Sequence, residues 1–205
     1  MKKTVILFLL AICFSVRGVS QGFMQVSFGT DVYSGDDYEG RQSASKTIDL
    51  QIGRFADEEL AESFTLGFST GLKYRDDLGT LRLPSGPEIK AERLYSFNIL
   101  SLGYERKIIW FGEFDDLWNV YTTRRLGLIL VQSKMEYNEP VIAALHSNDQ
   151  YSKTGIGFNV GASLGAARKF NKSTYAFSDL TLALNYGGEL LNMPVTLSLG
   201  VRRLF

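Results

Sequence analysis

Ser163 is the residue whose surroundings best fit a catalytic nucleophile. It is the central residue of Gly-Ala-Ser-Leu-Gly at 161–165, which matches the G-x-S-x-G pattern of hydrolase nucleophile elbows. That pattern requires the serine to lie on a strained turn between a strand and a helix. Residues 156–166 instead alternate between apolar side chains and small or polar ones, which predicts one unbroken strand. We therefore expect Ser163 to lie on the small, polar face of that strand and not to act as a nucleophile.

Histidine and cysteine, the other residue types with useful chemistry, each occur once. His146 is followed by Ser147, and neighbours in an extended strand point to opposite faces, so the two cannot act together on one face. We interpret both as polar loop residues. One histidine and one cysteine, Cys13, supply neither a multi-histidine metal site nor a cysteine-based zinc site. We assign no catalytic, cofactor-binding or metal-binding residue and expect no cofactor and no enzymatic activity.

Length and composition limit the number of domains and the classes of protein that the chain can belong to. The 205 residues fit one domain, and a hydrophobic content of 45% argues against disorder. The chain has 22 basic and 22 acidic residues, so its formal net charge is zero. Nucleic-acid-binding proteins carry a basic excess, so we expect no nucleic-acid partner.

The N-terminal segment has the pattern of a cleavable signal peptide. Two lysines precede an apolar run at 4–16, which is too short to span a membrane as a helix. Gly18 and Ser20 supply the small residues that precede a cleavage site. We expect a signal peptide at 1–20 and a single-domain mature chain at 21–205.

The rest of the sequence alternates with a period of two, which predicts strands. The clearest alternating segments are 24–29, 48–53, 66–73, 156–166, 180–185 and 195–202. Segment 94–106 also alternates, but its apolar parity slips, and a β-bulge near Asn98 would restore it. In segment 118–131 we assign Leu126, Leu128 and Leu130 to one face, opposite Arg125, Gly127 and Ile129. These segments predict eight strands.

The connections and the faces of these strands predict the architecture. Polar connections at 34–45, 76–90 and 134–150 are long, whereas those at 57–62, 111–117, 169–173 and 187–192 are short. One face of each strand is bulky and aliphatic, and the other is rich in Gly, Ser, Thr and Asn. A membrane barrel turns its apolar face outward to lipid and packs small and polar residues inside. We predict an all-β fold, an eight-stranded antiparallel up-and-down transmembrane β-barrel.

Six charged residues fall on, or near, the predicted inward face of the strands. They are Asp31, Asp49, Lys73, Glu105, Arg125 and Arg202. Charges packed into a narrow interior must pair, because an isolated buried charge is costly. The sequence therefore predicts a charge network that fills the lumen.

The final segment, 195–205, is amphipathic and ends in phenylalanine. Together with the signal peptide and the alternating strands over the whole mature chain, it resembles the small outer-membrane β-barrels of Gram-negative envelopes, the OmpA/OmpX-like and porin-family barrels. Members of that family end in an aromatic residue on a last strand that the barrel-assembly machinery reads as an insertion signal. Leu199, Val201 and Phe205 match this signal, whereas Arg203, at the same parity, departs from it.

The resemblance implies a location and a set of partners. It implies the cell outer membrane, with both termini of the mature chain in the periplasm. The implied partners are outer-membrane lipids and lipopolysaccharide, the barrel-assembly machinery through the last strand, and an extracellular partner for the long loops. It does not imply one activity, because members of such a fold serve many functions.

We expect a structural or surface-interaction role, and three other readings stay open. A small, porin-like solute channel requires an open lumen. An envelope-lipid-modifying enzyme requires histidine and serine on one strand face near the membrane. A soluble lipocalin-like barrel requires the apolar face to turn inward around a ligand.

Overall fold

The structure, a computed structural model, describes residues 21–33, 44–82, 86, 88–145, 148–187 and 190–205. The predicted signal peptide, with Cys13, lies outside the described residues, as do His146 and Ser147.

Almost all of the described chain is β-strand, and every pairing is antiparallel. The elements are β1 (Gly22–Tyr33), β2 (Ala44–Phe55), β3 (Leu60–Arg82), β4 (Glu88–Phe111), β5 (Trp118–Tyr137), α2 (Pro140–Leu145), β6 (Tyr151–Asn171), β7 (Thr174–Gly187), β8 (Leu190–Asn192) and β9 (Pro194–Leu204). Each long strand pairs with the next one along the chain, and β9 closes the ring against β1. The short β8 pairs with β7 immediately before β9. This ring of eight strands confirms the predicted barrel.

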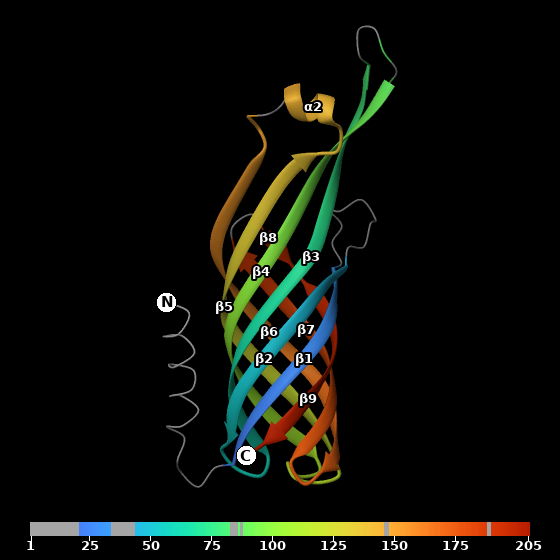
Figure 1. The fold of residues 1–205 in the computed structure, drawn as a ribbon. Coiled ribbons are helices and arrows are strands. Elements are labelled where there is room, and N and C mark those ends of the chain that lie inside the picture. The colour runs from blue at the N-terminus through green and yellow to red at the C-terminus, as the bar shows by residue number, and fades with distance from the viewer. Residues whose placement is uncertain (1–20, 34–43, 83–85, 87, 146–147, 188–189) are drawn as a thin grey trace.

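The two ends of the barrel differ in their connections and in how far the strands extend (Figure 1). Tight turns link β2 to β3, β4 to β5, and β6 to β7 at one end, which also holds the C-terminus. We call this the short-turn end and the opposite one the long-loop end. Strands β3 to β6 have 20 to 24 residues each, whereas β1, β2, β7 and β9 have 11 to 14. The longer strands therefore rise above the rest of the ring, with α2 beside their tips (Figure 1).

This extension differs from the predicted loops at 76–90 and 134–150. Strand β3 continues to Arg82, β4 begins at Glu88, and β5 runs to Tyr137. The polar and glycine residues of these segments are accommodated because the hairpin is exposed and contains a register shift at Gly79, where φ is +85°. Charged residues and glycine are typical of turns, but an exposed paired strand also tolerates them.

The bulge predicted near Asn98 is wrong, and the irregularity lies in the neighbouring strand. The register of β4 against β5 is continuous from Arg93 to Ile109. Strand β3 instead shifts register at Gly71, whose φ of +92° is accessible to glycine because it lacks a Cβ. The extra residue reverses which side chains face inward beyond it, so Leu72 is buried and Lys73 is exposed.

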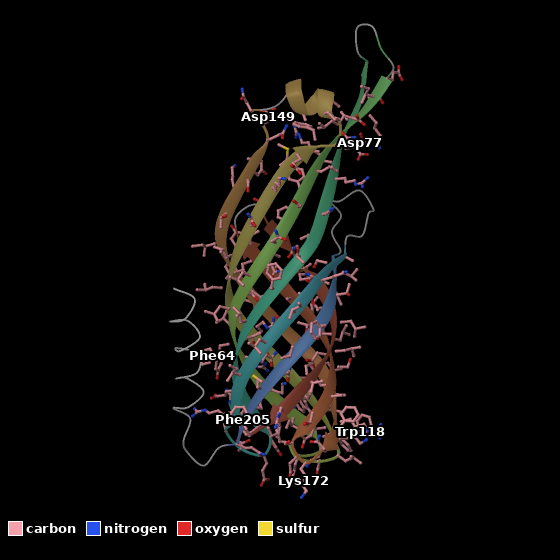
Figure 2. All side chains as sticks on the ribbon, in the orientation of Figure 1. Phe64, Asp77, Trp118, Asp149, Lys172 and Phe205 are labelled. Carbon is pink, nitrogen blue, oxygen red and sulfur yellow. The ribbon has the colours of Figure 1, made fainter. Side chains whose placement is uncertain are left out.

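The outer face of the ring is apolar on every strand. One outward residue from each of the eight long strands, between 48% and 63% exposed, illustrates this: Phe28, Ile48, Phe64, Leu102, Leu128, Leu164, Leu180 and Leu199. Figure 2 shows side chains such as Phe64 pointing away from the wall. The assignment of Leu126, Leu128 and Leu130 to the face opposite Ile129 is confirmed. Among the described helices, none is long and apolar enough to cross a membrane.

Candidate functional site

The interior near the short-turn end is filled by aromatic rings. Phe23, Phe55, Tyr121 and Phe177 project inward from four strands and are buried. Phe114 comes from the turn between β4 and β5 and packs among them. The turn is possible because Gly112 adopts a positive φ of +72°. We call this set, together with the Arg202 that it surrounds, the aromatic layer.

Arg202 is the charge at the centre of the aromatic layer, and it is 0% exposed. The central carbon of its guanidinium lies 5.2 to 5.7 Å from the ring centres of Phe23, Phe114, Tyr121 and Phe177. Such distances allow cation–π attraction, which is stronger in a desolvated site. Its Nε donates a hydrogen bond to Gln25 Oε1 at 2.9 Å.

Lys107 is a second buried basic residue at this level. Its Nζ lies 4.3 Å from the centre of the Tyr121 ring and 3.4 Å from Gln25 Oε1. Asp179, on β7, is also buried and faces the same interior. The aromatic layer and its neighbours therefore place two basic side chains beside rings, an amide oxygen and a carboxylate.

Next toward the long-loop end, the interior is polar. We call this level, which holds the ion-pair triad described here and the hydrogen-bond network of Asp31, the polar layer. Arg125 on β5 pairs with Asp49 on β2, at 3.3 Å, and with Glu105 on β4. Because β4 and β5 are neighbours, Glu105 and Arg125 are direct cross-strand partners, whereas Asp49 approaches across the lumen. The triad therefore ties one side of the ring to the other.

Asp31 forms a separate network of hydroxyl groups in the polar layer. Its carboxylate accepts hydrogen bonds from Ser45 at 2.8 Å, Ser69 at 2.9 Å and Thr196 at 2.6 Å. Thr47 donates a fourth at 3.2 Å. These donors come from β2, β3 and β9, so one carboxylate links the strands on either side of β1. Buried carboxylates are tolerated when they accept several hydrogen bonds in this way.

Beyond the polar layer, toward the long-loop end, the interior is apolar, which the sequence did not predict. Leu72, Phe97, Ile99, Ile129 and Val131 form a buried cluster on β3, β4 and β5. This cluster explains the slip of parity in segment 94–106. On the long-loop side of the polar layer the large apolar residues of β4 face inward, and on its short-turn side they face outward. A further cluster of Ala91, Met135, Tyr137 and Ile142 packs α2 against the extension.

Residues of the polar layer line a cavity of about 70 Å³. Asp31, Asp49, Arg125, Asn159 and Asp179 are among the residues that line it. A water molecule occupies roughly 10–15 Å³ on this measure, so the cavity holds about five waters. It is too small for a solute of metabolite size.

The structure places five of the six predicted lumen charges in the interior, in three groups. Asp49, Glu105 and Arg125 meet in the triad, Asp31 forms its own network, and Arg202 belongs to the aromatic layer. Lys73 points outward and is not part of the interior, because the bulge at Gly71 reverses its side of the wall.

Sequence reasoning missed Lys107, Phe114 and Asp179. Lys107 shares the parity of Glu105, and Asp179 shares that of Thr181, so continuous alternation would have identified both. Phe114 lies in a turn, where no periodic signal marks the direction of a side chain.

No hydrolase elbow surrounds Ser163. It lies in the middle of β6, is buried, and shares a hydrogen bond with the hydroxyl of Thr123 on β5. The motif at 161–165 is therefore part of a continuous strand. Within the described ranges, no group of three or more His, Cys, Asp and Glu residues is placed to hold a metal ion.

The hairpin of β3 and β4 at the long-loop end carries paired surface charges. Lys90 Nζ lies 2.9 Å from Asp77 Oδ2 and 3.1 Å from Glu92 Oε1. Hydrogen bonds to these two carboxylates raise the pKa of Lys90. Arg75 lies 3.6 Å from Glu92. Surface ion pairs of this kind stabilise only weakly.

Solved structures with this fold include two small surface proteins. Neisserial surface protein A aligns with a TM-score of 0.57 at 12% identity, over 90% of this chain and 97% of its own. Ail, the attachment invasion locus protein of Yersinia pestis, aligns with a TM-score of 0.51 at 11% identity, over 91% and 99%. No protein-family model and no curated protein sequence matches the chain. The chain thus has the fold of the small eight-stranded outer-membrane β-barrels.

Proposed function

We propose that this chain is an integral outer-membrane β-barrel protein whose filled interior holds surface-exposed loops in place, in a structural or surface-interaction role. The observation that carries the proposal is the outward apolar face on all eight long strands. A soluble lipocalin-like barrel turns this face inward around a ligand, whereas here the inward face holds the polar layer. Removing so much apolar surface from water requires a lipid environment.

The filled interior favours a closed barrel over a porin-like channel. The aromatic layer spans the lumen at the short-turn end, and Phe114 adds a ring from a turn. The triad of Asp49, Glu105 and Arg125 crosses it one level above. Eight strands give a barrel only wide enough for side chains to fill.

The chain ends support an orientation. Gly22 N donates a hydrogen bond to the Phe205 carbonyl oxygen at 3.1 Å, so the start of β1 and Phe205 meet at the short-turn end. Membrane barrels have short periplasmic turns and longer extracellular loops. We therefore assign both termini to the periplasm and the extension of β3 to β6 to the cell surface, where an extracellular partner would meet it.

The last strand supports recognition by the barrel-assembly machinery. Leu199, Val201 and Phe205 face outward and are 62%, 52% and 63% exposed. Figure 2 shows Phe205 at the base of the wall. Outer-membrane lipids and lipopolysaccharide would surround the remaining outward face. The proposal includes no catalytic residue and no cofactor.

Heat-modifiability tests the membrane barrel directly. The protein is expected to stay in the urea-washed envelope pellet and to migrate differently on SDS gels before and after boiling. A protein that washes off the membrane and shows no shift would contradict the proposal and point to a soluble barrel.

Planar-bilayer recording then separates the closed barrel from the channel. The purified protein is expected to give no stable, high-conductance openings. Regular openings of constant size would reject the filled interior and favour the solute channel.

A further inference from the structure

Four charged side chains lie in register across the outer wall, toward the short-turn end. Arg54 on β2 is the cross-strand partner of Glu62 on β3, Glu62 is the partner of Arg106 on β4, and Arg106 is the partner of Arg124 on β5. All four lie on the outward face, and the three arginines are exposed. We call these four residues the arginine row.

The arginine row is not neutral. It contains three cations and one anion, and the ion pair it forms joins Arg54 to Glu62 at 3.7 Å. Neither Arg106 nor Arg124 forms an ion pair with another residue of the described chain. Like charges directly opposite one another on a sheet repel. This pair is therefore best satisfied by an anion from outside the protein.

Aromatic residues lie on the short-turn side of the row, beyond Arg106 on β4 and before Arg124 on β5. Trp110 Nε1 donates a hydrogen bond to Thr122 Oγ1 at 2.7 Å, and Thr122 precedes Arg124 on the same face. The Arg168 guanidinium lies 5.1 Å from the centre of the Trp118 ring. Tryptophan gathers where lipid chains meet headgroups, and an outward arginine is tolerated at that level. The row thus lies just inside this tryptophan belt, from which long arginine side chains can extend to the headgroup phosphates.

Space beside Arg124, at one end of the row, admits a headgroup. The cross-strand partner of Arg124 on β6 is Ala162, and that of Arg54 on β1 is Gly22. Ala162 is small and exposed, so it leaves the wall open beside Arg124, whereas the ring of Phe205 covers Gly22 beside Arg54. By contrast, the exposed cations of the long-loop hairpin, such as Lys90 and Arg75, already have carboxylate partners.

We propose that the arginine row binds anionic phospholipid headgroups in the leaflet at the short-turn end, with one phosphate shared between Arg106 and Arg124. Guanidinium groups are suited to this because they donate paired hydrogen bonds to phosphate oxygens. The inference rests on the proposed membrane placement, and it adds a lipid preference that the barrel fold does not require.

The two tryptophans of the chain, Trp110 and Trp118, report on this level. The protein is refolded into vesicles that mix phosphatidylcholine with phosphatidylglycerol, and one lipid at a time carries brominated chains that quench tryptophan. The ratio of quenching by the two lipids gives their relative affinity for the wall. We expect a preference for phosphatidylglycerol of roughly three- to tenfold at low salt, from the attraction between basic residues and an anionic leaflet.

The double variant Arg106→Gln, Arg124→Gln is expected to bring the ratio close to one. The matched control, Lys73→Gln with Arg75→Gln, removes the same charge from the outward face toward the long-loop end and should keep the wild-type ratio. A salt titration of the unmodified protein needs no variant, and the preference should fall as salt rises to about 1 M.

The outcomes separate this inference from the membrane placement. Equal quenching by both lipids, a preference that survives in the double variant, or one that ignores salt overturns the headgroup site and leaves the barrel intact. If neither brominated lipid quenches the tryptophans, the membrane placement itself fails.

Discussion

Two arginines inside the barrel are held by different chemistry. Arg125, in the polar layer, faces the carboxylates of Asp49 and Glu105. Arg202, in the aromatic layer, is surrounded by four rings and donates one hydrogen bond to Gln25. Both are surrounded by protein, so the difference lies in the groups that contact each guanidinium: carboxylates for Arg125 and aromatic rings for Arg202.

The contrast teaches that the cost of losing a buried charge depends on what remains behind. Removing Arg125 leaves two carboxylates facing each other away from bulk water, and an unpaired buried charge is strongly unfavourable. Removing Arg202 leaves rings, which an apolar side chain can contact, and Lys107 stays in the same interior as the Asp179 carboxylate. The two nitrogens at the end of the Arg202 guanidinium also have no hydrogen-bond partner in the described chain.

Arg125→Met is the substitution expected to have the largest effect. It should lower the free energy of unfolding by about 3–5 kcal/mol, because Asp49 and Glu105 lose their cation. Urea titration of the refolded barrel in lipid vesicles measures this change. The triple variant Asp49→Asn, Glu105→Gln, Arg125→Met is the control, and it should recover most of the loss. A triple variant as unstable as the single one would show that Arg125 acts through packing and not through charge.

Arg202→Met should cost less, about 2 kcal/mol, which corresponds to the lost cation–π attraction in a desolvated site. Gln25 Oε1 keeps a donor, since Lys107 Nζ lies 3.4 Å away. The same urea titration compares the two variants directly. If Arg202→Met proves as damaging as Arg125→Met, the aromatic layer depends on a full charge and the comparison collapses.

Gly71→Ala tests the bulge that bounds the polar layer. The bulge keeps Ser69 inward, where it donates to Asp31, and turns Leu72 into the apolar cluster above. No atom lies within 4 Å of a Cβ added at Gly71, so the cost is conformational and should be about 1 kcal/mol. Gly71→Asn should cost less, because asparagine tolerates positive φ. Equal losses in the urea midpoint for Ala and Asn would point away from the backbone as the cause.

The sequence predicted the ring well because alternation is a local signal. Each strand carries its own apolar face, and closure follows from pairing neighbours in order. Three members of the predicted charge set meet in one triad for the same reason: Asp49, Glu105 and Arg125 all share the inward parity of their strands.

The errors have non-local causes. Glycine recurs throughout these strands, so nothing distinguishes Gly71 as the site of a bulge, and Lys73 was assigned to the wrong face. The inward Phe97 and Ile99 were then explained by a bulge near Asn98, although they pack against residues of β5. Phe114 enters the interior from a turn, and only the tertiary structure reveals that contact.

Replacing an exposed arginine should give the smallest change in the free energy of unfolding. Arg75 is 57% exposed at its side chain and lies 3.6 Å from Glu92, which also pairs with Lys90. Arg75→Gln should therefore change the free energy of unfolding by less than about 0.5 kcal/mol, because exposed ion pairs are screened and Glu92 retains a cation. The difference from the unmodified protein should vanish at about 1 M salt. A larger, salt-insensitive loss would show that the extension is coupled to the barrel through this hairpin, and charge on its surface would then matter as much as charge inside.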